Sequence, residues 1–386
     1  MAEEVALALI GCGGNMGAHV RGYRTLWEND LRNFRILATC DVAVEKAENL
    51  ADQVAEFQGA RPAVYRDFRR MLDEQSSLDA CDISVVHSEH HKVAIPCLQS
   101  GRHVTIEKPL AITCRAARAI IEAAEKAGRL LQIAENYRRS PQSRAINWAL
   151  GQQRIGSPRM LYWIDVRERL WYWGWREHRE KAGGGWTMDG GVHFADLFRY
   201  HVGEVSTLFA LSRAYYPVRF RDRENMADPV EVSVEDTTHA VLEFENGVSG
   251  VWLESNVAHG APFGHRALYG SEGSLHWGSG IQLRSGEKTS IEELVEQHRR
   301  ALGPEGLEAL FPRGVTDTIA TELWEFIQAI KGNGAIETDG REGLKDLAIS
   351  MAVYESAALG QPVEVARVEN CEIETYQADL NAAAGL

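Results

Sequence analysis

The sequence lacks the features that mark a membrane protein or a nucleic-acid-binding protein. No apolar run reaches the length of a membrane-spanning helix, and the acidic start MAEEVALALIGCGG is too short in apolar length for a signal peptide. The formal net charge is -14, and no basic run is present that could attract a polyanion. We therefore expect neither a membrane nor a nucleic acid as a partner.

Cysteine is also sparse, with six residues scattered along the 386. Their positions show no paired spacing, so the sequence predicts free thiols rather than disulfides or a zinc site. Free thiols are typical of a reducing compartment, and we expect the cytoplasm. The length suggests two domains, and the proportions of 45% hydrophobic and 25% charged residues are ordinary for a globular protein.

A glycine turn follows the first predicted strand. Residues 5–10 form a buried-strand pattern, GCGGNMG follows directly, and residues 18–27 predict a helix. This order is the fingerprint of a dinucleotide site, in which the backbone approaches the pyrophosphate at the helix N-terminus. A plain tight turn is the alternative, and Met16 stands where Gly or Ala is usual. The candidate nucleotide-binding residues here are Gly11, Gly13, Gly14, Asn15 and Met16.

The second predicted strand, residues 34–40, ends at Asp41. A carboxylate at this point can accept hydrogen bonds from both ribose hydroxyls of adenosine and would repel a 2′-phosphate. Asp41 therefore favours NAD over NADP. The alternative is an exposed Asp that only ends a strand.

Helices and strands continue to alternate, which predicts a doubly wound parallel sheet over residues 1–138. Ligands of such sheets bind at the carboxyl ends of the strands. Strands predicted over 80–86 and 103–106 lead there to the cluster His87–His91 and to Glu107-Lys108-Pro109. Pro109 keeps Lys108 out of the helical region and allows a cis bond. Further predicted elements are helices over 42–57, 67–74 and 116–127 and a strand over 130–134.

The second part of the chain, residues 139–386, has a different predicted order of secondary structure. Strands follow one another without long helices between them, which predicts an α+β domain with a large, open, mainly antiparallel sheet. Helices over 317–331 and 340–359 would pack back on the sheet or on the first domain. A sheet with one bare face usually hides it in an oligomer, so we expect a homodimer or homotetramer. The predicted strands are 159–166, 206–215, 237–245, 248–255, 266–269 and 273–277.

A segment written GGGWTMDGGVHFADLFRY, residues 183–200, places Asp189 and His193 four residues apart. On a helix this spacing puts both side chains on one face, where the carboxylate can fix the imidazole tautomer and raise its basicity. Gly190 and Gly191 would permit the close approach of a backbone, a cofactor ring or a substrate. The alternative is an ordinary amphipathic helix whose histidine is hydrogen-bonded in the core.

An aromatic loop, LWYWGW at 170–175, precedes this segment. Trp173 and Trp175 could form a wall for the apolar face of a sugar, with Arg176 and His178 binding its hydroxyls. The alternative is that these rings pack on a neighbouring subunit.

Taken together, these motifs resemble the family of glucose-fructose oxidoreductase and inositol dehydrogenase (Gfo/Idh/MocA), and their order and spacing cover nearly the whole chain. One departure is Val85-Val86-His87, where the family usually has Thr-Pro-Asn and makes contacts to the nicotinamide ribose. The motifs that carry the resemblance are GCGGNMG, Asp41, His90, EKP at 107–109, ENYRRSP at 135–141 and the D-x-x-x-H of 189–193.

The resemblance implies catalytic roles for Lys108, Asp189 and His193. His193 would be the base, Asp189 would orient it and bind substrate, and Lys108 would hold the reacting oxygen and the nicotinamide ribose. The resemblance also implies cofactor contacts from His87, His90, Glu107, Lys108 and Asn136. Implied substrate contacts come from Lys108, Tyr137, Arg138, Trp173, Trp175, Arg176, Asp189 and His193.

Three functions follow from this resemblance. The first is NAD-dependent oxidation of a secondary hydroxyl on a sugar, glycoside or cyclic polyol. The second is a redox-neutral change to a glycoside that begins with the same oxidation, and the third is a non-catalytic regulator that binds NAD. Two residue sets could be interpreted as metal ligands, but neither has a recognisable zinc spacing, so no metal is predicted. They are Asp189, His193 and Asp196, and His87, His90 and His91.

Overall fold

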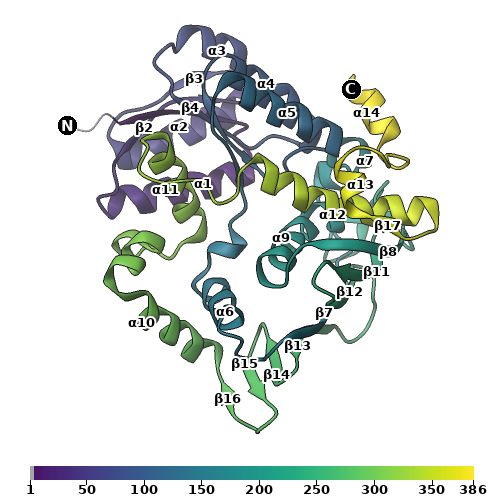
Figure 1. Ribbon diagram of the computed structural model, residues 1–386. Helices are drawn as coiled ribbons and strands as arrows, with labels where there is room; N and C mark the ends of the chain where they lie inside the picture. Colours follow the sequence, from purple (N-terminus) through teal and green to yellow (C-terminus); the bar gives the residue numbers. More distant parts are fainter. Residues whose placement is uncertain (1–3) are drawn as a thin grey trace. The chain divides into compact units, whose positions relative to one another are not determined.

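The computed structural model describes residues 4–386, so the first three residues of the acidic start lie outside the described part (Figure 1). The chain divides into two compact units. The first comprises the chain up to Ala111, Ala116–Ser140 and Gly303–Leu344, and the second comprises Ile112–Arg115, Pro141–Leu302 and Lys345–Leu386. The division into a dinucleotide-binding domain of residues 1–138 and a substrate-binding domain of residues 139–386 remains a prediction.

The first unit contains a six-stranded parallel sheet in the order β3-β2-β1-β4-β5-β6. This is the Rossmann arrangement, and it confirms the fold predicted for the first part of the chain. The predicted strand over 80–86 ends earlier, at Ile83, and β3 was not predicted because its three residues are partly exposed. The strands are β1 Val5–Ile10, β2 Phe34–Cys40, β3 Ala63–Tyr65, β4 Ala80–Ile83, β5 His103–Glu107 and β6 Leu131–Ala134.

Helices pack on this sheet, and their apolar side chains form part of the hydrophobic core of the unit. Helix α11 (Thr318–Ile330), from the segment Gly303–Leu344 of this unit, packs on α1 (Gly14–Glu28). Asp317 caps α11 by accepting a hydrogen bond from Ala320 N at 2.7 Å. Gly22 permits this approach, since a Cβ there would lie 3.1 Å from Leu323 Cδ1. The other helices that begin before Ser140 are α2 Val44–Gln58, α3 Phe68–Glu74, α4 His90–Gln99 and α5 Cys114–Ala127.

The second unit contains a nine-stranded sheet in the order β16-β15-β14-β13-β7-β12-β11-β8-β17. Every pair is antiparallel except β7 with β12, which confirms the predicted mainly antiparallel sheet. The strands are β7 Pro158–Val166, β8 Val205–Arg213, β11 Thr237–Phe244, β12 Ser249–Ser255, β13 Phe263–Gly270, β14 Gly273–His276, β15 Gly280–Leu283, β16 Lys288–Thr289 and β17 Val363–Glu364.

One face of this sheet is covered by helix α9 (Gly191–His201). Phe194 and Phe198 pack against Trp163 of β7, with ring centroids 5.0 and 5.4 Å apart. The opposite face carries exposed apolar side chains, among them Val241 of β11, which is 57% exposed. Asp189 and His193 were expected on one helix that follows the three glycines, but they lie on two, α8 (Trp186–Asp189) and α9, on either side of Gly190.

Several elements of the chain were not predicted from the sequence. They include the hairpin of β9 (Val218–Asp222) and β10 (Ala227–Glu231) and the helix α10 (Ile291–Leu310), which is interrupted at Gly303. No helix within residues 4–386 combines the length and the apolar composition needed to cross a bilayer. The remaining helices are α6 Pro141–Gly151, α7 Arg179–Ala182, α12 Gly340–Leu359, α13 Val365–Glu369 and α14 Ala378–Ala384.

Candidate active site

The glycine turn after β1 leaves open space at the start of α1. Gly11 has φ +85°, and a Cβ there would lie 2.3 Å from Ser84 O, so this position requires glycine. A Cβ at Gly13 or Gly14 would meet no atom within 4 Å. The N-terminus of a 15-residue helix therefore borders unfilled space, an arrangement that suits a pyrophosphate.

Asp41 lies beside this turn. Its Oδ2 accepts a hydrogen bond from Cys12 N at 2.7 Å, and its Oδ1 accepts one from Ala43 N at 2.8 Å. The carboxylate is thus held by two backbone N–H groups and keeps further lone pairs for ribose hydroxyls. Burial, reinforced by the charge of Asp41, raises the pKa of the Cys12 thiol to about 12, so this thiol is uncharged. The turn and Asp41 fit a dinucleotide.

Met16 occupies a buried position on α1. Its side chain is fully buried in the core formed by α1, the first strands and α11. A nucleotide contact from this residue would therefore come from its backbone, and an apolar side chain here is explained by packing.

The strand β5 ends at Glu107, and the peptide bond between Lys108 and Pro109 is cis. The Glu107 carboxylate has a partner that the sequence did not suggest. His19 of α1 is buried, with Nε2 3.2 Å from Glu107 Oε1 and Nδ1 2.9 Å from Asp82 Oδ2. A lone histidine in a helix gives no signal in the sequence that would predict this contact.

His90 connects two loops at the carboxyl edge of the sheet. Its Nδ1 lies 3.3 Å from Leu110 O and its Nε2 lies 3.2 Å from Val85 O. Burial lowers the pKa of this imidazole, so the neutral form is favoured. Both ring nitrogens face backbone carbonyls, so His90 holds the segment after β4 against the segment after Pro109.

The ENYRRSP motif follows β6 and contains three predicted ligand contacts. Asn136 Nδ2 donates a hydrogen bond to Thr318 Oγ1 at 2.8 Å. Tyr137 is 43% exposed, whereas Arg138 is buried, with ion-pair distances of 3.8 Å to Glu337 and 3.9 Å to Glu342. Within this motif, Tyr137 is the side chain most accessible to a ligand.

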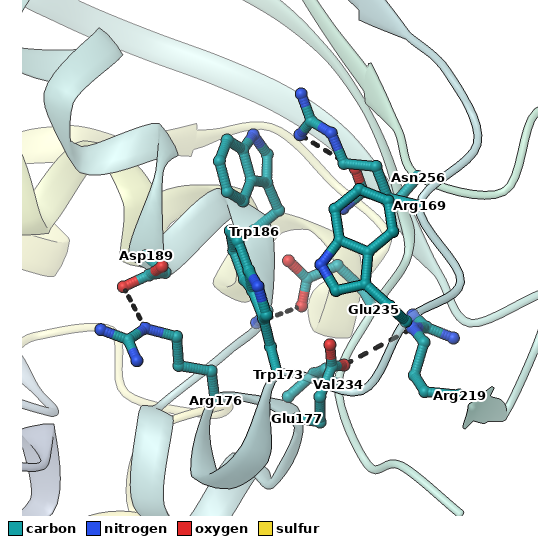
Figure 2. A pocket seen from close by; sticks show the side chains of 12 residues that line it. Arg169, Trp173, Arg176, Glu177, Trp186, Asp189, Arg219, Val234, Glu235 and Asn256 are labelled. Atoms are coloured by element: carbon teal, nitrogen blue, oxygen red, sulfur yellow. Dashed lines mark hydrogen bonds and ion pairs between the residues drawn. The ribbon is translucent and has the colours of Figure 1, made fainter. Parts of the chain in front are cut away.

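A pocket that is open to solvent lies in the second unit (Figure 2). It combines three indole rings with three guanidinium groups and three carboxyl groups, which suits a ligand with apolar faces and many hydrogen-bonding groups. Among the residues predicted to bind substrate, Trp173, Arg176 and Asp189 line it. The lining residues are Arg169, Trp171, Trp173, Arg176, Glu177, Gly185, Trp186, Asp189, Arg219, Val234, Glu235 and Asn256.

Tryptophan rings and guanidinium groups lie close together in the lining of this pocket. The rings of Trp173 and Trp186 are 5.5 Å apart and tilted by 37°, and the Arg169 guanidinium lies 4.7 Å from the Trp186 ring. Trp175 is not among the lining residues, and its ring lies 4.5 Å from the guanidinium of Arg176. An aromatic wall of Trp173 and Trp186 is therefore available to a ligand.

Asp189, the last residue of α8, is paired with Arg176, whose Nε lies 3.2 Å from Asp189 Oδ1. His193 lies in the first turn of α9, and both Asp189 and His193 are 8% exposed. The two glycines between them are required by packing on indole rings. A Cβ at Gly190 would lie 2.5 Å from Trp186 Cε2, and one at Gly191 would lie 2.6 Å from Trp252 Cζ2.

Two further acids shape the pocket, and neither was singled out from the sequence. Glu235 Oε2 accepts a hydrogen bond from Gly185 N at 2.7 Å, and its Oε1 accepts one from Thr187 N at 3.1 Å, so it holds the start of α8. Glu177 Oε2 lies 3.6 Å from Nε of Arg219 (Figure 2). Arg219 belongs to β9, a strand that was not predicted from the sequence. Burial raises the pKa of Glu177, and the charge of Arg219 partly opposes this.

The part of the chain that the structure describes, residues 4–386, contains no group of three His, Cys, Asp or Glu side chains arranged to hold a metal ion. The candidate features of the two units are the glycine turn after β1, Lys108 at the end of β5, and the pocket lined by indoles, guanidinium groups and carboxylates.

The fold and the glycine turn define the class of NAD(P)-binding oxidoreductases with a Rossmann domain. Residues 5–135 match the family model described as "Oxidoreductase family, NAD-binding Rossmann fold", and residues 149–365 match "Oxidoreductase family, C-terminal alpha/beta domain". The chain belongs to the Gfo/Idh/MocA family of oxidoreductases, as the resemblance indicated.

Characterised relatives are distant. The chain is 29% identical over 292 residues to 1,5-anhydro-D-fructose reductase of Ensifer adhaerens, covering 75% of this chain and 80% of that protein. It is 26% identical to D-glucoside 3-dehydrogenase of Escherichia coli, covering 94% of this chain and 98% of that protein. Its fold is similar to that of levoglucosan dehydrogenase solved with NADH and L-sorbose, with a TM-score of 0.76, 22% identity and coverage of 95% and 100% of the two chains.

Proposed function

We propose that this protein is an NAD-dependent dehydrogenase that oxidises a secondary hydroxyl group of a sugar, glycoside or cyclic polyol. The observation that carries the proposal is the pocket of the second unit, where Asp189 lies among indole rings and guanidinium groups. Indoles bind the apolar faces of sugar rings, and charged groups bind their hydroxyls. The names of both sequence relatives, a reductase and a dehydrogenase of sugar compounds, support the same substrate class.

NAD supplies the acceptor for the hydride that leaves the substrate carbon. The open space at Gly13 and Gly14 and the start of α1 would bind its pyrophosphate. Asp41 would accept hydrogen bonds from the adenosine ribose and repel a 2′-phosphate, so we propose NAD rather than NADP. Asn15, His87, His90, Glu107 and Asn136 complete the proposed cofactor-binding residues.

His193 would take the hydroxyl proton as the general base. Asp189 would orient the imidazole and bind substrate, and the Arg176 guanidinium would hold Asp189 in place. Lys108 would bind the reacting oxygen and the nicotinamide ribose, and its positive charge would stabilise alkoxide character as the proton leaves. Tyr137, Arg138, Trp173 and Trp175 are the further proposed substrate contacts.

A second candidate is a redox-neutral glycoside-modifying activity. The three indoles that line the pocket, Trp171, Trp173 and Trp186, provide more aromatic surface than a free monosaccharide requires. Oxidation of a glycoside beside the bond to be cleaved acidifies the neighbouring C–H, and the hydride can later return to the product. Release of NADH in equal amount to product supports the dehydrogenase, and product without net NADH supports the redox-neutral activity. The residues Lys108, Asp189 and His193 argue against a non-catalytic regulator.

The proposal is tested by screening sugars, glycosides and cyclic polyols for NAD reduction, followed by the near-ultraviolet absorbance of NADH. His193→Ala should lose most turnover while NADH binding, measured by fluorescence titration, is retained. Full activity of the variant would remove His193 from the mechanism. Absence of NADH binding by the unaltered protein would contradict the proposed function itself.

We also propose that the protein acts in the cytoplasm and assembles as a homodimer or homotetramer through the exposed face of the nine-stranded sheet. Apolar side chains gather there on three neighbouring strands. Val241 of β11 lies in register between Phe209 of β8 and Val251 of β12. Burial of such a face against a second copy would remove apolar area from water.

A further inference from the structure

His19 occupies a buried position between two carboxylates of the first unit. It lies on α1, and its ring is 1% exposed. Its Nδ1 lies 2.9 Å from Asp82 Oδ2 on β4, and its Nε2 lies 3.2 Å from Glu107 Oε1 at the end of β5. The imidazole therefore bridges α1 to two adjacent strands at their carboxyl edge.

These contacts determine the charge of the ring. A neutral imidazole has one N–H and one lone pair, and here the lone pair would face a carboxylate. With both nitrogens protonated, each donates to an acid, so the contacts favour an imidazolium. Burial alone would lower the pKa of His19, but the charges and hydrogen bonds of Asp82 and Glu107 outweigh it and raise the pKa well above its usual value.

Two further groups near the imidazolium are the Tyr23 hydroxyl and the Glu322 carboxyl. Asp82 also accepts a hydrogen bond from Tyr23 OH at 3.0 Å. Glu322 of α11 lies near enough for its charge to interact with that of His19, and burial raises the pKa of Glu322 well above its usual value, so its neutral form is favoured. The charge of His19 is therefore balanced mainly by Asp82 and Glu107.

We propose that His19 is a positioning residue for Lys108, an inference that rests on the proposed function. Glu107 is the last residue of β5 and immediately precedes Lys108, so a hydrogen bond that holds Glu107 against α1 also fixes the backbone position of Lys108. His19 lies on the helix that starts at the glycine turn, and it thereby couples the nucleotide-binding turn to the lysine.

The test measures NADH binding, since Lys108 is proposed to hold the nicotinamide ribose. His19→Gln keeps one donor but cannot bridge both acids or carry the charge. We expect it to weaken NADH binding about tenfold, the usual scale for loss of one charge-assisted hydrogen bond that positions a ligand contact. Tyr23→Phe is the matched control, because it also removes a hydrogen bond to Asp82 but leaves Glu107 untouched, and it should bind NADH as the unaltered protein does.

A double-variant comparison separates positioning from general loss of structure. In a Lys108→Ala background, His19→Gln should weaken NADH binding by less than about twofold further, because the lysine that His19 positions is already absent. Glu107→Gln, at a partly exposed side chain, provides a second route if His19→Gln folds poorly, and thermal melting reports the folding of each variant. Once a substrate is found, His19→Gln should lower kcat more than Tyr23→Phe does.

Equal effects of His19→Gln and Tyr23→Phe on NADH binding would overturn the role of His19. Full additivity of His19→Gln with Lys108→Ala would also overturn it. Both outcomes leave the proposed function intact, provided that the unaltered protein binds NADH and oxidises a sugar. If the unaltered protein fails to bind NADH, the proposed function fails and the positioning role fails with it.

Discussion

The guanidinium Nε of Arg176 lies 3.2 Å from Oδ1 of Asp189, so the carboxylate proposed to orient His193 is itself held by a cation. Arg176 in turn stacks on the ring of Trp175 at 4.5 Å. Trp175 of the aromatic loop therefore contacts Asp189 only indirectly, by packing against Arg176, which pairs with Asp189. The pair also supplies a counter-charge to a largely buried carboxyl group in a pocket lined by indoles.

Replacing Arg176 with methionine should lower kcat/KM by roughly ten- to a hundredfold, because Asp189 would lose both its orientation and its counter-charge. The measurement is steady-state kinetics with NAD and the substrate found in the screen. Arg223→Met is the matched control, since that guanidinium also stacks on a tryptophan, Trp171, at 4.1 Å. Similar kinetics for the two variants would show that Asp189 does not depend on Arg176.

The cofactor preference depends on Asp41. Asp41→Asn keeps an oxygen that can accept the hydrogen bond from Cys12 N but removes the charge that would repel a 2′-phosphate. We expect the ratio of kcat/KM for NADP to that for NAD to rise by roughly tenfold. Asp79→Asn is the control, because Asp79 also accepts a backbone hydrogen bond, from Ala6 N at 2.8 Å, but lies before β4 begins. An unchanged ratio in Asp41→Asn would contradict the proposed ribose contact.

Glu254 should make stability depend on pH. It is buried on β12, with 4% of its surface exposed. Burial raises the pKa of Glu254 from the ordinary value of 4.5 to about 8; the neighbouring indole N–H of Trp252 partly opposes this, and the charge of Asp165 adds to it. The folded state therefore keeps a proton that the unfolded state releases, and the stabilisation present below pH 4.5 is lost as the pH rises to about 8.

Glu254→Gln, which cannot ionise, should remove this loss. At pH 8 the variant should unfold with a free energy higher than that of the unaltered protein by on the order of 1–3 kcal/mol, and the difference should shrink toward pH 5. Urea unfolding followed by circular dichroism at both pH values measures it. Glu243→Gln, at an exposed side chain of β11, is the control and should give no such pH dependence. A gain of equal size at both pH values would show that ionisation of Glu254 is not the cause.

The assembly proposed through the exposed sheet face depends on its apolar surface. Val241→Glu places a charge in the middle of this face and should convert the oligomer to monomers, because burial of an unpaired carboxylate is strongly unfavourable. Size-exclusion chromatography with light scattering measures the mass. Val42→Glu, at an exposed apolar residue of the first unit, is the matched control and should leave the mass unchanged. A monomeric unaltered protein would refute the proposal.

Local pattern was sufficient to predict the long and well-buried elements. Residues 5–10, 34–40 and 340–359 were predicted as strand, strand and helix, and the structure has β1, β2 and α12 with the same bounds. The glycine turn and the carboxylate that follows β2 were also recognisable, because a nucleotide site imposes residue types at adjacent positions. Short or exposed elements, such as β3 and the hairpin of β9 and β10, carry too little hydrophobic periodicity to be recognised.

The sequence by itself therefore determined the family and the two kinds of sheet, and it supplied the candidate catalytic residues, because each is written in short segments of adjacent residues. Only the tertiary structure decided what holds those residues. His19 meets Asp82 and Glu107 across 63 and 88 residues of sequence, and Glu235 meets Gly185 across 50. Hydrogen bonds and ion pairs of this kind depend on which strands and helices become neighbours, and no local pattern encodes a partner so far away along the chain.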